Sequence, residues 1–133
     1  MADITVTKAN VSALNEGHTY RGDLAGAALT AGQVTYIDGS NGYKLADASA
    51  AATAKVAGLV IAPSDVASGD GGFDVAVPGC LIGGFSGMTP GDLLYLSDTA
   101  GALADTPGTV SKPCARAITS TEILWTLEGV DPS

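Results

Sequence analysis

The sequence predicts an all-β domain, a small β-sandwich or β-barrel built from a duplicated β-unit with an extended N-terminal arm. Three observations lead to this prediction. Short segments rich in β-branched and aromatic residues recur about every eight to twelve residues, each bounded by Gly, Pro, Asn or Asp, which is typical of sandwiches and barrels. The chain is rich in turn formers, with 18 Gly among 133 residues. In addition, residues 88–105 closely repeat residues 29–47.

The repeat has a nearly constant offset. Gly32 and Tyr36 are matched 59 positions later by Gly91 and Tyr95, and both copies continue into a turn glycine and a Leu-Ala-Asp sequence. The offset then falls to about 57 through small differences in the turns, which is how a duplicated supersecondary unit looks. The pattern predicts one β domain over 25–133, with repeat units at approximately 25–84 and 85–130.

The expected strands follow from the β-rich segments. They are 33–37, 43–45, 56–61, 73–77, 93–97, 114–118 and 123–127. Residues 62–72, with Pro63 and three glycines, predict a long hairpin loop. Only residues 46–55 have helical composition, and ten residues are marginal for an unsupported helix. The glycines of 83–87 indicate a bulge or sharp corner.

Residues 1–24 lie outside the duplication. Apolar residues alternate there at Ile4 and Val6, then at Val11 and Leu14. Two interpretations remain open: an arm that orders against a neighbouring molecule, or an edge strand of the same domain. In an arm that adds a strand to a partner, Ile4, Val6 and Val11 would fill alternate pockets.

The formal charge of −8 disfavours a nucleic-acid partner, because phosphate backbones are bound mainly by clustered basic residues and the six Lys and Arg are scattered. No secretory signal and no stretch of 18 apolar residues occurs, which predicts synthesis in the host cytoplasm and no membrane partner. Cys80 and Cys114 are expected to be buried thiols, with a disulfide as the alternative.

Few residues suit catalysis or metal binding. His18 is the sole histidine, and we expect it in a polar loop because a triad or zinc site needs further partners. Asp65, Asp70 and Asp74 lie near the Gly-rich loop and could wrap calcium, although turn formation is the plainer interpretation. The sequence therefore predicts no enzyme activity and no cofactor.

Two further sets of residues, a pair of aspartates and three aromatic residues, could either bind or cleave a sugar or have purely structural roles. Asp47 and Asp105 hold matching repeat positions and could be paired acids for glycoside cleavage, but their place after Leu-Ala favours a turn role. Trp125, Tyr36 and Tyr95 could form a carbohydrate platform. Because both tyrosines hold equivalent strand positions, we expect them to pack against core layers instead.

The arrangement resembles the capsid decoration, or cement, proteins of tailed bacteriophages over roughly residues 25–129. The residues that carry this resemblance are Thr89, Gly91, Asp92 and Tyr95, then Gly101, Leu103 and Asp105, then Cys114 to Ile118, and finally Trp125 and Leu127. The segments 56–60 and 73–79 also fit that family, in which a Val-x-Gly-Val strand precedes a strand ending in glycine.

The resemblance implies a structural virion protein on the capsid exterior, often a homotrimer, that binds the major capsid protein and clamps neighbouring subunits together. The alternating residues Ile4, Val6, Val11 and Leu14 are then the expected capsid-binding residues. A tail-fibre or spike-associated β module that binds a glycan or another virion protein is the alternative.

Overall fold

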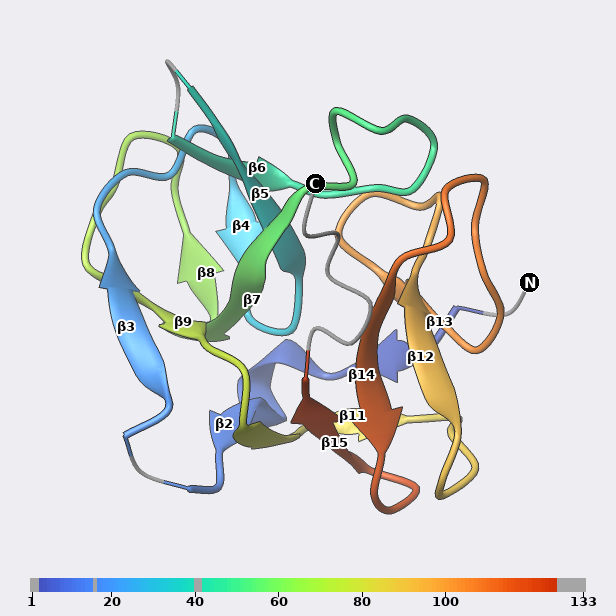
Figure 1. The fold of residues 1–133 in the computed structure, drawn as a ribbon. Coiled ribbons are helices and arrows are strands. Elements are labelled where there is room, and N and C mark those ends of the chain that lie inside the picture. Colours follow the sequence, from blue (N-terminus) through green and yellow to red (C-terminus); the bar gives the residue numbers. More distant parts are fainter. Residues whose placement is uncertain (1–2, 16, 40–41, 127–133) are drawn as a thin grey trace.

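The computed structural model describes residues 3–15, 17–39 and 42–126. It confirms the all-β prediction, with two main antiparallel sheets in a sandwich arrangement (Figure 1). The first sheet has the order β3 (Thr19–Gly22), β9 (Phe73–Ala76), β7 (Val56–Ala62), β5 (Val34–Asp38), β6 (Gly42–Leu45). The second has the order β13 (Leu103–Ala104), β12 (Leu93–Leu96), β14 (Pro113–Ala117), β15 (Glu122–Trp125), β10 (Cys80–Gly83), β2 (Ser12–Ala13).

Two small strand pairs and one short helix complete the described fold. The pairs are β4 (Leu29–Thr30) with β8 (Asp65–Val66), and β1 (Thr5–Val6) with β11 (Phe85–Ser86). A 3-10 helix spans Lys8–Asn10. Both strand pairs lie at the margins of the main sheets, where they add backbone hydrogen bonds to connections that would otherwise be loops.

The sheets confirm the duplication. The order β6-β5-β7-β9-β3 in the first sheet matches β13-β12-β14-β15-β10 in the second. Val34 lies opposite Leu59 and the register shifts after Thr35; correspondingly, Leu93 lies opposite Arg116 and the register shifts after Leu94. These pairs keep the sequence offsets of 59 and 57, so the same irregularity was inherited by both copies. We call β3 to β9 (residues 19–76) unit 1 and β10 to β15 (residues 80–125) unit 2.

The boundaries between the units differ from the sequence prediction of 25–84 and 85–130. β3 and β10 hold the same place in the two sheets, since Tyr20 pairs with Val75 and Ile82 pairs with Ile123. Unit 1 therefore begins at β3, and β10 opens unit 2 instead of closing unit 1. The sequences of the two strands, Thr-Tyr-Arg-Gly and Cys-Leu-Ile-Gly, are too different for this equivalence to be recognised without coordinates.

All seven expected strands are present, with ends that differ by one or two residues. The last ends at Trp125, and Leu127, its expected final residue, lies outside the described residues. The segment 46–55 is not helical and contains turns instead, with the Ala54 amide donating to the Ala50 carbonyl at 3.1 Å. The expected long loop contains β8, which pairs with β4.

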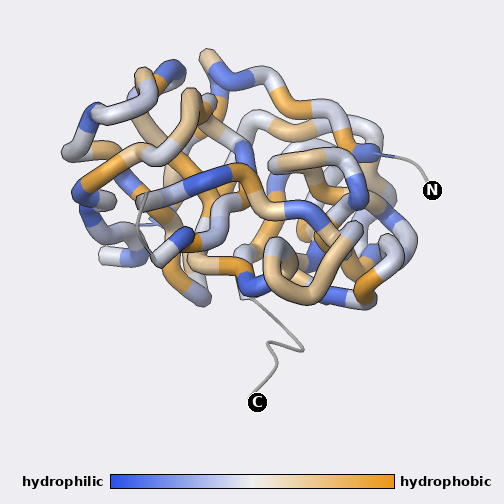
Figure 2. The backbone as a smooth tube through the Cα atoms, turned by 90° about the horizontal axis from the view of Figure 1, so that it is seen from above, coloured by the Kyte–Doolittle hydropathy of each residue, from blue (hydrophilic) through white to orange (hydrophobic). Residues whose placement is uncertain are grey.

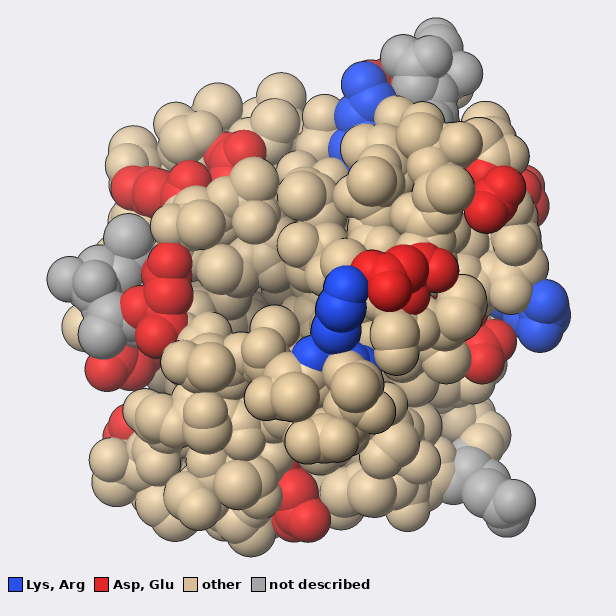
Figure 3. Space-filling view, turned by 180° about the vertical axis from the view of Figure 1, so that it is seen from behind, with Lys and Arg blue, Asp and Glu red and all other residues tan. Residues whose placement is uncertain are grey.

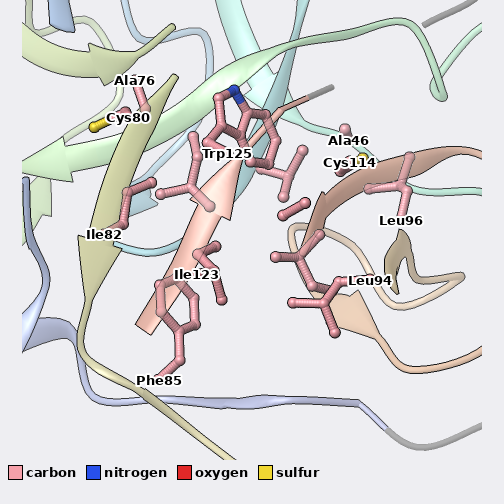
Figure 4. Close-up of a cluster of buried hydrophobic side chains, with 14 of the residues drawn as sticks. Ala46, Ala76, Cys80, Ile82, Phe85, Leu94, Leu96, Cys114, Ile123 and Trp125 are labelled. Atoms are coloured by element: carbon pink, nitrogen blue, oxygen red, sulfur yellow. The ribbon is translucent and has the colours of Figure 1, made fainter. Parts of the chain in front are cut away.

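The main core lies between the two sheets and draws on both units. Val34 and Leu59 of unit 1 are fully enclosed in one cluster with residues of unit 2. Figure 4 shows three of the latter, Leu94, Ile123 and Trp125. Figure 2 shows hydrophobic segments in both halves of the molecule. Because both units contribute to this cluster, it joins them into one domain.

A second, smaller cluster covers the other face of the first sheet. The T-shaped pair of Tyr43 and Phe73, with ring centroids 5.2 Å apart, packs there with Val60 and Val75. Leu29 of β4 and Val66 of β8 close this cluster from outside. Unit 1 is consequently covered on both faces of its sheet.

Cys80 and Cys114 are both buried and free. Burial raises the pKa of the Cys80 thiol and raises the pKa of the Cys114 thiol to about 12. Since the thiolate is the reactive form, neither cysteine is activated as a nucleophile in this fold.

Candidate functional site: the N-terminal segment and its seat

Residues 3–15 contain the four expected capsid-binding residues, and they lie along unit 2. In Figure 1 this blue segment passes beside β15 and β11 before it reaches β3. β1 is antiparallel to β11, and β2 is antiparallel to β10 at the edge of the second sheet. Of the two interpretations left open by the sequence, the structure therefore places the segment as an edge of its own domain.

Main-chain hydrogen bonds hold the segment along its length. The amides of Ile4, Thr7 and Leu14 donate to the carbonyls of residues 103, 84 and 81 at 2.8, 2.9 and 2.7 Å. The side chain of Asn15 closes the far end, since its Oδ1 accepts from the Leu81 amide at 2.8 Å. This is the geometry of strand addition, in which main-chain bonds supply affinity and alternate side chains supply specificity.

The apolar side chains of the segment already have partners. Ile4, Val6 and Val11 are partly buried and pack against the main core, whereas Leu14 is 47% exposed. Ile4 and Val6 also line a groove of about 100 Å³ between the β4–β5 turn, Phe85 and residues 100–103. The role of these residues in capsid binding stays a prediction, and in this conformation only Leu14 is available without movement of the segment.

Two glycines make room for the segment. Gly32 has φ +92° and Gly84 has φ +106°. A Cβ on Gly32 would lie 2.3 Å from Val6 Cγ2, and a Cβ on Gly84 would lie 2.8 Å from the backbone of Val11. Any other residue at these positions would combine backbone strain with a clash, so the seat depends on both glycines.

β1 pairs with a short strand of unit 2 as β8 pairs with a short strand of unit 1, although the offset of 59 maps β4 onto Met88–Thr89 and not onto β11. In unit 1, the long β7–β9 connection supplies β8, which pairs with β4 just before β5. In unit 2, the corresponding β14–β15 connection is only residues 118–121, and β11, just before β12, pairs with β1 instead. The N-terminal segment thus compensates for the shorter connection of the second copy.

The residues considered for metal binding do not converge. Asp65 forms an exposed ion pair with Lys8 at 2.5 Å, and Asp74 lies 3.8 Å from Arg21. Within residues 3–15, 17–39 and 42–126, no group of three His, Cys, Asp or Glu side chains is placed to hold a metal ion. Figure 3 shows acidic side chains scattered over one face with isolated basic ones.

Asp47 has the turn role that its position indicated. Its Oδ1 accepts from the hydroxyl and amide of Ser49 and, at 3.0 Å, from the Thr53 hydroxyl. The hydrogen bond from the Ser49 hydroxyl lowers the pKa of Asp47, with the Ser49 amide and Thr53 acting in the same direction. His18, the sole histidine, is partly buried, and its ring lies beside Gly79 at the start of unit 2.

The aromatic residues proposed as a sugar platform are separated by burial. Trp125 is 0% exposed and cannot stack on a ligand. Tyr36 packs against the main core, as expected. Tyr95 differs from the expectation that both tyrosines pack on a core layer, because its neighbours Leu94 and Leu96 point into the core and Tyr95 points away from it.

Comparisons with known proteins leave the family open: no family model, no curated protein and no solved structure matches the chain. Across the part of the chain that the structure describes, no helix has the length and hydropathy needed to cross a bilayer.

Proposed function

We propose that this chain is a structural virion protein that binds the outer surface of a phage capsid and reinforces contacts between major capsid subunits. It is made in the host cytoplasm, assembles as a homotrimer and needs no cofactor. The proposal builds on the sequence resemblance to capsid decoration proteins.

One structural observation supports it: residues 3–15 are held as added strands by main-chain bonds and alternate side chains. Among the described strands, β1 pairs with β11 alone and β2 lies at the edge of the second sheet, so the segment can separate without breaking the pairing between other strands. A strand edge on a capsid subunit offers the same main-chain partners as Leu81, Gly84 and Leu103 do. Attachment then exchanges one set of equivalent bonds for another.

The energetics of this exchange decide where the affinity comes from. Complete burial of a Val or Ile side chain stabilises by roughly 1.5–3 kcal/mol. Ile4, Val6 and Val11 already gain part of this free energy, because they are partly buried against the main core of their own domain. The shell must therefore offer pockets of similar depth. The main gain comes from many copies bound side by side, because attachment at one site restrains the next.

The primary test mixes the purified protein with heads of the virus that encodes it, assembled without the protein. We expect cosedimentation with the heads and a higher temperature of head disruption. Failure to cosediment would reject the function.

A disulfide lock tests the segment separately. Thr5 and Ser86 lie directly opposite each other, both exposed, and opposed antiparallel residues have Cα separations that suit a disulfide. A Thr5→Cys/Ser86→Cys variant should lose head binding when oxidised and regain it when reduced. Each single variant, treated identically, is the matched control.

The lock is preferable to deletion of residues 1–15, because deletion uncovers the core beneath Val6 and Val11 and can unfold the chain. Equal head binding by the oxidised and reduced forms would reject the attachment role of Ile4, Val6 and Val11 while leaving capsid binding intact. The alternative function, a glycan-binding tail module, is less well supported, because Trp125 is enclosed in the core and cannot stack on a sugar.

A further inference from the structure

The outer face of the second sheet carries an apolar surface that we call the open face. Alternation along the strands defines it: Leu94 and Ile123 are 0% exposed and point into the core, so Leu93 and Leu124 point away from it. The apolar residues of the open face are Leu14, Leu81, Leu93, Tyr95, Ile118 and Leu124.

Cross-strand pairing joins these side chains into one surface. Leu81 lies opposite Leu124, Leu124 lies opposite Arg116, and Arg116 lies opposite Leu93. Leu14 and Ile118 at its margins are 47% and 45% exposed. An antiparallel sheet with one solvated face normally alternates apolar and polar residues, whereas the outer face of this sheet is mostly apolar, with Arg116 and Glu122 among its leucines.

The duplication shows what covers such a face. Superposing the two strand orders shows which residues of the two units hold equivalent positions. Val34 is equivalent to Leu93, Tyr36 to Tyr95, Leu59 to Arg116, Ile61 to Ile118 and Ala76 to Leu124. In unit 1 this face packs against unit 2, so Ile61 is 6% exposed where Ile118 is 45% exposed. Among the described residues, the same face is thus covered by a second β-unit in one copy and only partly covered in the other, where Leu81, Leu93, Tyr95 and Leu124 are half-buried.

From this difference we propose that the open face is the surface through which copies of this chain pack against one another. In unit 1, the equivalent face is covered by a β-unit of the same fold. A second copy of the chain would bring such a unit to the open face. The opposite face of unit 1 is closed by β4 and β8 in every copy, so each copy contributes its open face to the contact.

Charge favours the same partner. The chain carries a net charge of −8, so copies repel one another over most of their surfaces. At the centre of the open face the charged side chain is Arg116, whose Nη1 donates to the Gly91 carbonyl at 3.1 Å, and its paired neighbours are leucines. Glu122 lies on the same side of β15 as Leu124, so the open face carries both an acidic and a basic side chain and lacks the acidic excess of the chain as a whole.

The size of the face sets the expected strength. Five strands spaced about 4.8 Å apart, each with about four residues on the sheet, give a surface of roughly 24 by 14 Å. That is smaller than the roughly 800 Å² per partner of a standard stable interface. We therefore expect association that depends on concentration, which crowding of many copies on one assembly would strengthen.

The test measures molecular mass against concentration by sedimentation velocity, without any capsid. The wild-type chain should rise above its monomer mass of 13.1 kDa as concentration increases. Leu14→Asp and Ile118→Asp should weaken self-association by about tenfold or more. Both residues are about half exposed, so the monomer tolerates the change, and Trp125 fluorescence checks that each variant is folded.

Ile37→Asp is the matched control, because Ile37 is 55% exposed and lies on the first sheet. It should associate like the wild type. The proposal is overturned if the wild type stays monomeric to its solubility limit, if the two open-face variants associate normally, or if Ile37→Asp is equally disruptive. A monomeric wild type whose head binding is lost in Ile118→Asp would assign the face to the shell instead. The proposal assigns a surface to the self-association in the proposed function, but it does not depend on head binding, so a failed head-binding experiment leaves it standing.

Discussion

The indole nitrogen of Trp125 is buried and has no hydrogen-bond partner among the described residues. An enclosed, unpaired donor costs about 1–3 kcal/mol, so this side chain stabilises the fold by its packing in spite of its polar atom. Trp125 lies between the two units in the main core, where its ring is fully enclosed.

Substitution of Trp125 separates these two contributions. Trp125→Ala should lower the free energy of unfolding by about 3–5 kcal/mol because it leaves a large cavity. Trp125→Phe should cost only about 1–2 kcal/mol, since the lost packing is partly offset by removal of the unpaired N–H. Urea unfolding followed by circular dichroism measures both. A Phe variant as unstable as the Ala variant would mean that the nitrogen has a partner.

Cys114 gives the protein a predictable weakness at alkaline pH. Burial raises its pKa to about 12 in the folded state, whereas an exposed thiol titrates near 8.5. Between these values the unfolded chain has lost the proton and the folded chain has kept it, so the free energy of unfolding falls as pH rises. From pH 8 to pH 10 we expect a loss of about 1–2 kcal/mol from this group.

Cys114→Ala isolates that loss. Other titrating groups are the same in both chains, so the variant should lose less stability between pH 8 and pH 10 than the wild type does. Equal pH dependence of urea unfolding in the two proteins would contradict the assignment to Cys114.

The N-terminal segment is the element whose position depends most on a few backbone contacts. Gly84→Ala would place a methyl group against the Val11 backbone at a positive φ. Gly87 has φ +87°, and a Cβ added there would have nothing within 4 Å, so Gly87→Ala imposes similar strain without the contact. We expect Gly84→Ala to be less stable than Gly87→Ala by about 1–3 kcal/mol.

Hydrogen exchange locates this effect. The Thr7 and Leu14 amides, which donate to Gly84 and Leu81, should exchange faster in Gly84→Ala and remain protected in Gly87→Ala. Faster exchange spread over the whole chain, with no preference for residues 4–14, would show that the segment is not a separate opening unit.

The sequence predicts long strands better than short ones, and the reason is physical. Segments such as 56–61 contain enough β-branched residues to favour extended backbone by themselves. The two-residue strands β4, β8 and β11 owe their pairing to tertiary position, and their residues carry no local pattern that marks them. Residues 46–55 show the converse, since their helical composition is overridden by the turn that Asp47 organises.

The candidate site was predictable only in part for the same reason. Alternation of Ile4 and Val6 correctly indicated an extended segment, but alternation says nothing about which edge receives it. The decisive features are Gly32 and Gly84, whose role depends on contacts with Val6 and Val11 from a distant part of the chain. The open face was not predicted from the sequence, although the uninterrupted apolar run at 93–96 fits a sheet covered on both sides.

At the scale of the whole molecule, duplication produced two units with the same strand order and different surroundings. Unit 1 supplies its own β8 and is covered on both faces, while unit 2 borrows β1 and keeps one face open. The borrowed strand and the shared core mean that unit 2 is completed by residues outside itself. We therefore expect neither unit to be stable without the other.

This dependence predicts a single cooperative unfolding transition. Leu59 of unit 1 and Leu94 of unit 2 are both 0% exposed in the same core cluster, so Leu59→Ala and Leu94→Ala should each cost about 2–5 kcal/mol. Trp125 fluorescence reports on unit 2 and far-ultraviolet circular dichroism reports on both units. In each variant the two signals should shift together, whereas Ile37→Ala, at a 55% exposed position, should change stability by less than about 0.5 kcal/mol. If Leu59→Ala moved part of the dichroism signal and left the Trp125 transition in place, the units would be folding separately, and the shared core would not be what joins them.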